Sequence, residues 1–257
     1  MGLPQELVDH IVDMLHDDIL TLKACSLVCK PMFASTSRHL KCRRLSIALS
    51  SSILEAFASG GRPIHYTRQL HIASIKPFTP DDLLPRLHHF KSMNRVHTLT
   101  IDFYHAIAWV DDYKTNFAHF YSTLTSLTLC CPSGHYRLIL QFALQFPNLE
   151  SLGIEWLDDE NWLGLGLMAP TTIDQYPPLR GRLRLAGANA ATKFLADLAY
   201  AFPNGLNFRS IELKSIPGEV IGQIANQYRT QTLEDVTLVL SIFGTHQHSF
   251  SSLIVAG

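Results

Sequence analysis

The sequence predicts an α/β protein in which a small three-helix module is followed by an irregular solenoid of parallel strands and helices. Three observations lead to this prediction. Apolar residues recur at helical spacing in the first 45 residues, short strand-like runs recur beyond them about every 28 residues, and apolar helical segments separate several of these runs. We therefore expect a helical module over residues 1–45 and an α/β solenoid of about seven units over residues 46–257.

The helical module begins with an apolar stripe. An apolar residue stands at every fourth position from Leu3 to Leu15, which is typical of one face of a helix, and Pro4 suits its first turn. A second apolar set runs from Leu20 to Cys29, and Pro31 ends or kinks it. A third short segment extends to Leu45. A unit of about 45 residues is marginal without a partner, so this apolar surface predicts a docking face for another polypeptide. An ordinary helical core with no partner is the alternative.

Residues 3 to about 42 closely resemble the F-box. The pattern Leu-Pro, Glu-Leu, spaced Ile and Leu, an acid, Leu and then Cys-Ser-Leu-Val-Cys-Lys is matched in order from Leu3 to Lys30. One departure is Met32, where many F-boxes have Trp. The resemblance implies that the module binds the Skp-type adaptor of a cullin–RING ubiquitin ligase. The adaptor-binding residues implied by the resemblance are Leu3, Pro4, Leu7, Ile11, Leu15, Leu22, Leu27 and Val28.

The remainder of the chain repeats a strand-like run of the form Leu-x-x-Leu-x-Leu. The central residues of seven runs stand at positions 70, 99, 127, 152, 183, 211 and 236, with gaps of 29, 28, 25, 31, 28 and 25 residues. Helical segments over 138–146, 194–202 and 220–228 share one apolar template. This alternation is typical of a leucine-rich-repeat solenoid and resembles the degenerate repeats that follow F-boxes. A doubly wound α/β domain is the alternative, although no continuous apolar strand or Gly-rich phosphate loop is clear.

In such a solenoid, strand residues between the buried positions face outward along a concave surface. We expect this surface as a whole to bind a target protein, and an ordinary solvated face is the alternative for each residue taken singly. Its charges are mixed, so no ligand of a single sign is indicated. The candidate target-binding residues are Thr100, Asp102, Thr128, Glu155, Arg184, Glu212, Lys214 and Thr237.

Composition and motifs disfavour several other classes of protein. A net charge of −1 argues against a protein that coats nucleic acid, and five irregularly spaced cysteines indicate reduced thiols in the cytoplasm, the nucleus or both. The longest uncharged stretch, 236–257, is a poor membrane span because it contains His and Ser. His246-x-His248 lacks further metal ligands, and we expect no cofactor, metal or catalytic residue. Residues 241–257 either form an atypical cap or mark a chain shorter than the functional protein.

These expectations give three hypotheses for function. The first is a non-enzymatic substrate receptor, in which the F-box docks on the adaptor and the repeats hold a target near the ligase. The second is an interaction protein whose F-box binds the adaptor without delivering anything for ubiquitylation. The third is an α/β enzyme with a fortuitous helical start.

Overall fold

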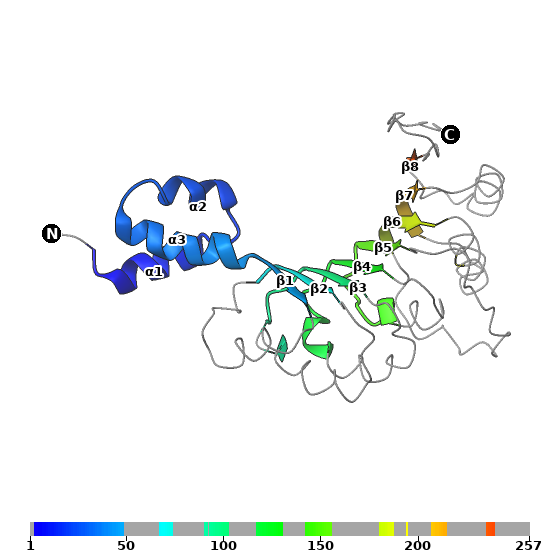
Figure 1. The fold of residues 1–257 in the computed structure, drawn as a ribbon, viewed down its shortest axis with the longest axis horizontal. Helices are drawn as coiled ribbons and strands as arrows, with labels where there is room; N and C mark the ends of the chain where they lie inside the picture. The colour runs from blue at the N-terminus through cyan, green and yellow to red at the C-terminus, as the bar shows by residue number, and fades with distance from the viewer. Residues whose placement is uncertain are drawn as a thin grey trace.

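In the described part of the chain, three α-helices are followed by one parallel sheet, so the α/β class is confirmed (Figure 1). The structure, a computed structural model, describes residues 3–48, 67–73, 90–91, 93–102, 117–130, 142–155, 180–187, 194, 207–214 and 235–239. The predicted helical segments over 194–202 and 220–228, except for Phe194, and the C-terminal segment 241–257 lie outside these residues.

The helical module consists of α1 (Gln5–Met14), α2 (Ile19–Cys25) and α3 (Lys30–Cys42). Helix α2 ends earlier than its apolar pattern suggests, because residues 26–28 form a turn. Pro31 lies in the first turn of α3, where its missing N–H removes no helical hydrogen bond. It therefore opens the third helix rather than kinking the second.

The prediction that the third helical segment extends to Leu45 was wrong. Helix α3 ends at Cys42, and Leu45 belongs to β1 (Arg44–Ala48). This strand pairs in parallel with β2, placing Leu45 beside Leu70. Pairing with a neighbouring strand thus overrides the helical spacing of Leu45, and the module gives way to the sheet at Arg43.

Among the described residues, the sheet contains eight parallel strands in chain order, one more than the seven predicted units. The strands after β1 are β2 (Gln69–Ala73), β3 (Thr98–Asp102), β4 (Ser126–Cys130), β5 (Ser151–Glu155), β6 (Arg180–Ala186), β7 (Asn207–Lys214) and β8 (Asp235–Val239). A doubly wound sheet reverses its strand order at a switch point. The order β1 to β8 contains no such reversal.

The register confirms the predicted repeat spacing. All seven predicted central residues, from Leu70 to Val236, lie in one row across the sheet, and Leu45 extends that row to β1. A second row, from Ile47 to Leu238, lies two residues further along each strand. In β2, β3 and β4 these two positions are buried and the intervening ones are half-buried. Such alternation is typical of a sheet with one packed face.

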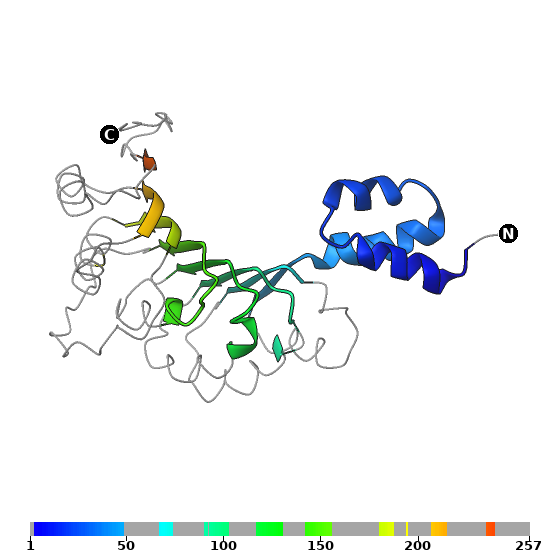
Figure 2. The same ribbon diagram turned by 180° about the vertical axis from the view of Figure 1, so that it is seen from behind.

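Aromatic side chains pack together in the layer beneath this sheet. The 3₁₀ helix η4 (Ala118–Phe120) and the helical turn at Phe142 lie on the same side of the strands (Figures 1 and 2). The Phe117 ring centroid lies 6.3 Å from that of Phe90 and 5.9 Å from that of Phe142. All three side chains are buried, so aromatic contacts join successive repeats on the packed side of the sheet.

Backbone hydrogen bonds repeat at the amino-terminal edge of the strands. The carbonyls of Arg43, Arg68, His97 and Thr125 each accept hydrogen bonds from two consecutive N–H groups of the next repeat, at 2.8–3.1 Å. Because each of these carbonyls lies just before or at the start of a strand, the contacts hold the entry points of neighbouring strands together. We call this set of contacts the carbonyl ladder.

Candidate functional site

Helix α1 carries apolar residues on two of its faces. Val8 and Val12 are buried in the module, with exposed fractions of 4% and 0%. Residues three and four positions apart lie on the same side of a helix. The second set follows that spacing but is exposed, and it consists of Leu7, Ile11 and Met14, with the exposed Leu3 just before the helix. Only one of the two apolar faces of α1 is therefore covered.

Large exposed apolar side chains are confined to the helical module in the described part of the chain. There are nine of them, and all lie between residues 3 and 33. Leu20 on α2 is 78% exposed, Leu27 in the following turn 88% and Phe33 on α3 55%. The concentration of such side chains in one small unit is typical of an interaction surface.

Six of the eight predicted adaptor-binding residues are exposed, namely Leu3, Pro4, Leu7, Ile11, Leu27 and Val28. The other two point inward. Leu22 has an exposed fraction of 1% and packs with Val8 and Val12, and the half-buried Leu15 packs against the same cluster. Leu22 therefore stabilises the module from within and is not available for direct contact. Met32, the departure from the F-box pattern, also packs against this cluster.

Sequence reasoning missed four of the exposed apolar residues, which are Met14, Ile19, Leu20 and Phe33. Met14 continues the exposed stripe of α1 three residues after Ile11, a helical spacing that could have identified it. Leu20 and Phe33 lie among other apolar residues, where the sequence alone does not reveal which side chains the neighbouring helices cover.

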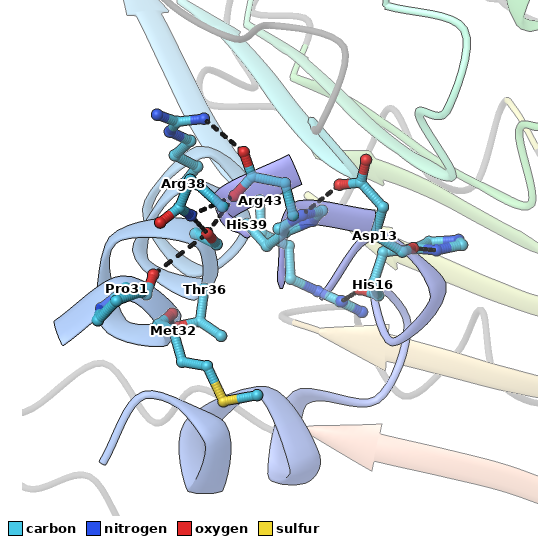
Figure 3. Close-up of polar contacts among 11 residues, drawn as sticks. Asp13, His16, Pro31, Met32, Thr36, Arg38, His39 and Arg43 are labelled. Carbon is cyan, nitrogen blue, oxygen red and sulfur yellow. Dashed lines mark hydrogen bonds and ion pairs between the residues drawn. The ribbon is translucent and has the colours of Figure 1, made fainter. Parts of the chain in front are cut away.

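Polar contacts join α1 to α3 beside the small apolar core (Figure 3). Asp13 Oδ1 lies 2.8 Å from Nε2 of the buried His39, and Ser35 donates a hydrogen bond to Asp9. Burial lowers the pKa of His39, although the neighbouring Asp13 carboxylate opposes this shift. The hydrogen bond from Ser35 is the largest cause of a lowered pKa at Asp9. These contacts fix how α1 lies on α3 and leave its Leu7 face free.

The neighbouring acids Asp17 and Asp18 have different roles. Asp18 caps α2, because its carboxylate accepts hydrogen bonds from the backbone N–H and the hydroxyl of Thr21 at 3.0 and 2.6 Å. The same contacts lower the pKa of Asp18. Asp17 instead forms an ion pair with Arg68, at the start of β2. The two neighbouring acids thus stabilise different parts of the fold, Asp18 the start of α2 and Asp17 the contact between the helical module and the sheet.

The predicted target-binding residues occupy two rows on the same strands. One row contains Thr100, Thr128, Arg184, Glu212 and Thr237, and the other contains Asp102, Glu155 and Lys214. Successive side chains alternate between the two faces of a strand, so both rows lie on the face opposite the buried leucines. The register therefore brings the first seven of these residues, in chain order, to one face of the sheet, and it places the backbone of Thr237 beside Glu212.

Charged side chains gather on this face between β3 and β7. Arg184 lies 3.7 Å from Glu155 Oε1 and 3.3 Å from Glu212 Oε1, so one guanidinium is shared by carboxylates from both neighbouring strands. Cys130 lies between Asp102 and Glu155 in the register. Burial, followed by the charges of Glu155 and Asp102, raises the pKa of its thiol to about 12. Cys130 is therefore protonated at neutral pH and a weak nucleophile.

The described residues include no cluster of three or more His, Cys, Asp or Glu side chains arranged to hold a metal ion. Within the same part of the chain, no helix has the length and apolar character needed to span a membrane. The exposed and half-buried residues among those predicted lie on two surfaces, an apolar one on the helical module and a polar one on the sheet. The chain matches no known family model, and no curated protein matches it.

Proposed function

We propose that this protein is an F-box-type substrate receptor. Its helical module docks on the Skp-type adaptor of a cullin–RING ubiquitin ligase. The face of its sheet opposite the buried leucines holds a target protein. The observation that carries this proposal is the exposure of Leu7, Ile11, Leu27 and Val28, with fractions of 38% to 88%, on the unit whose sequence resembles an F-box. Burying such side chains against a partner removes apolar surface from water and favours binding.

We further propose that the sheet is a degenerate leucine-rich-repeat solenoid. Strands in chain order, apolar rows that run in register across all eight strands, aromatic contacts between repeats and the carbonyl ladder all support units that contact mainly their neighbours. The face carrying Thr100, Thr128 and Arg184 is the surface offered to the target. Its mixed charges favour recognition by complementary polar groups rather than by one charge sign.

The mechanism of such a receptor is proximity. Holding a target close to the ligase raises the effective concentration of its lysines near the charged conjugating enzyme. In this proposal the chain supplies binding energy and geometry, and the chemistry takes place on other subunits of the ligase.

Adaptor capture tests the proposed docking. The full chain should retain a purified Skp-type adaptor in a pull-down, and the double variant Leu7→Asp, Ile11→Asp should lose it because two carboxylates would have to be desolvated in the interface. The control is His10→Asp, Lys23→Asp, which places two acids at exposed polar positions of α1 and α2 and should retain capture. Failure of the unmodified chain to bind the adaptor would refute the proposal.

Ubiquitin transfer separates the receptor from a non-delivering interaction protein. A protein that co-purifies with the chain through the sheet face should be ubiquitylated in a ligase reconstituted with the chain, and not with the Leu7→Asp, Ile11→Asp variant. Adaptor capture without any transfer would favour an F-box interaction protein with no role in ubiquitylation.

A further inference from the structure

The joint between the helical module and the sheet contains almost no linker. Only Arg43 separates the last residue of α3 from the first residue of β1, and its carbonyl accepts hydrogen bonds from the N–H groups of Arg68 and Gln69 at 2.9 Å. Its guanidinium donates to the His16 carbonyl at 3.2 Å (Figure 3). Arg43 thus contacts both the α1–α2 loop and the start of β2.

Arg68 makes a second connection between the two parts. Its Nη2 atom lies 3.1 Å from Asp17 Oδ1, in the loop between α1 and α2. The Arg68 side chain is only 8% exposed, whereas that of Asp17 is 65% exposed. A guanidinium is rarely this buried without specific partners, because removing its charge from water is costly.

The other end of the Arg68 guanidinium reaches the following repeats. Its Nη1 atom lies 3.3 Å from the Arg95 carbonyl oxygen and 3.3 Å from His97 Nε2. His97 Nδ1 lies 2.9 Å from the Thr123 carbonyl oxygen, which can only accept a hydrogen bond. The contacts therefore assign the proton to Nδ1 and leave Nε2 as an acceptor for Arg68.

These contacts form a continuous chain from the helical module to the segments that precede the third and fourth strands. Asp17 anchors one end, Arg68 bridges, and His97 passes the connection to the turn before β4. Burial lowers the pKa of Arg68, and the nearby charge of Asp17 opposes this shift. The rigid fork of an arginine suits this task, because it directs several donors to fixed positions in one plane.

We propose that Arg68 is a positioning residue that locks the helical module onto the sheet. It thereby fixes the direction from the exposed apolar residues of the module to the target-binding face. The inference deepens the proposed function, on which its biological meaning rests: a receptor must hold its target at a defined place relative to the adaptor. The chemical contacts that carry it lie within this chain alone.

A distance measurement between the two parts tests this role. Spin labels on genetically encoded residues at the exposed positions Lys23 and Lys214 avoid labelling the native cysteines. In the full chain, the distance distribution should be narrow. Arg68→Gln should widen it at least twofold, because the neutral side chain loses the ion pair to Asp17. In Arg68→Lys the width of the distribution should lie between those of the unmodified chain and Arg68→Gln, since lysine keeps the charge but lacks the planar guanidinium.

Arg95→Gln is the matched control. Arg95 joins the network through its carbonyl oxygen, so changing its side chain should leave the distribution narrow. Equal widening in Arg95→Gln and Arg68→Gln would overturn the proposal, as would an unchanged distribution in Arg68→Gln.

Asp17→Asn provides the test if Arg68→Gln does not fold, because it removes the same ion pair at an exposed residue. It should also widen the distribution, and combining it with Arg68→Gln should widen it no further. A narrow distance distribution in Asp17→Asn would refute the claim that the Asp17–Arg68 ion pair holds the helical module on the sheet. Adaptor capture should be unchanged in Asp17→Asn. The distances are measured on this chain alone. If the unmodified chain fails to bind the adaptor, the proposed function is refuted, but the positioning role of Arg68 is not affected.

Discussion

Gly181 shows how strongly a single position in this sheet depends on its residue type. Its φ is +85°, and a Cβ atom built on it would lie 2.0 Å from the Glu150 carbonyl oxygen. The register between β6 and β7 shifts at the same point, between Gly181 and Arg182. Here the backbone passes so close to the preceding repeat that only a residue without a side chain fits.

Replacing Gly181 by Ala should destabilise the protein by about 2 kcal/mol or more, since both the left-handed conformation and the backbone clash oppose a Cβ atom. Urea unfolding monitored by circular dichroism measures this change. Gly153→Ala is the comparison, because its Cβ would meet only the Thr128 side chain, at 3.0 Å, which can move. A cost at Gly181 no larger than at Gly153 would contradict this account.

The buried His39 predicts a pH dependence of stability. Because burial holds the pKa of His39 below its value in the unfolded chain, the unfolded state binds a proton first as the pH falls. Stability should therefore decline as the pH falls from about 6.5 towards the lower pKa of the folded state. Urea unfolding at pH 7.5 and pH 5.5 would measure the decline.

The variant His39→Gln should reduce that pH dependence, since glutamine does not titrate. The exposed His10 is the matched control, and His10→Gln should leave the pH dependence unchanged. Identical pH dependence in the unmodified chain and in His39→Gln would show that burial of this imidazole is not its source.

Among the structural elements, the row of phenylalanines should contribute most to coupling between repeats. Phe117 has an exposed fraction of 0% and contacts the rings of Phe90, Phe120 and Phe142. Phe117→Ala should therefore lower the free energy of unfolding by about 3–5 kcal/mol. Phe33→Ala removes the same group from a 55% exposed position and should cost much less. Similar losses in the two variants, measured by urea unfolding, would contradict the proposed packing.

The strands from β2 onward could be predicted from sequence because the apolar residues that recur in each repeat are the ones that occupy the packed positions of the sheet. Every predicted central residue falls in the same row, since each strand needs two inward apolar side chains for its place in the sheet. Strand β1 was missed because it follows α3 after a single residue, with no turn signal between them. Its parallel partner β2 lies in the next repeat, so only tertiary pairing reveals the strand.

The candidate site was predictable only in part, for a physical reason that α1 illustrates. This helix has two apolar faces, and its pattern does not reveal which one α2 and α3 cover. Tertiary packing buries the face of Val8 and leaves that of Leu7 exposed, while Leu22 turns inward on α2. Contacts made by charged groups are equally non-local, and nothing near Asp17 in the sequence indicates Arg68 as its partner.

For the molecule as a whole, the exposed apolar residues predict self-association in the absence of a partner. The isolated chain should form larger species as its concentration rises, because apolar patches associate in water. Leu7→Asp, Ile11→Asp should reduce this association in sedimentation velocity experiments. It should change the free energy of unfolding by no more than about 0.5 kcal/mol per site, since neither side chain is in the core. Unfolding of the variant would instead assign these leucine and isoleucine side chains a structural role.

The Arg43 carbonyl has a consequence for any attempt to recombine this molecule. Arg43 caps the end of α3, and its carbonyl is also the first acceptor of the carbonyl ladder, so one residue belongs to both parts. A chimera with a flexible Gly-Ser spacer between α3 and β1 would displace this acceptor. The N–H groups of Arg68 and Gln69 would then lose their hydrogen-bond partner. A graft of the helices onto another scaffold should therefore keep β1 and β2, which hold this acceptor and its two donors together.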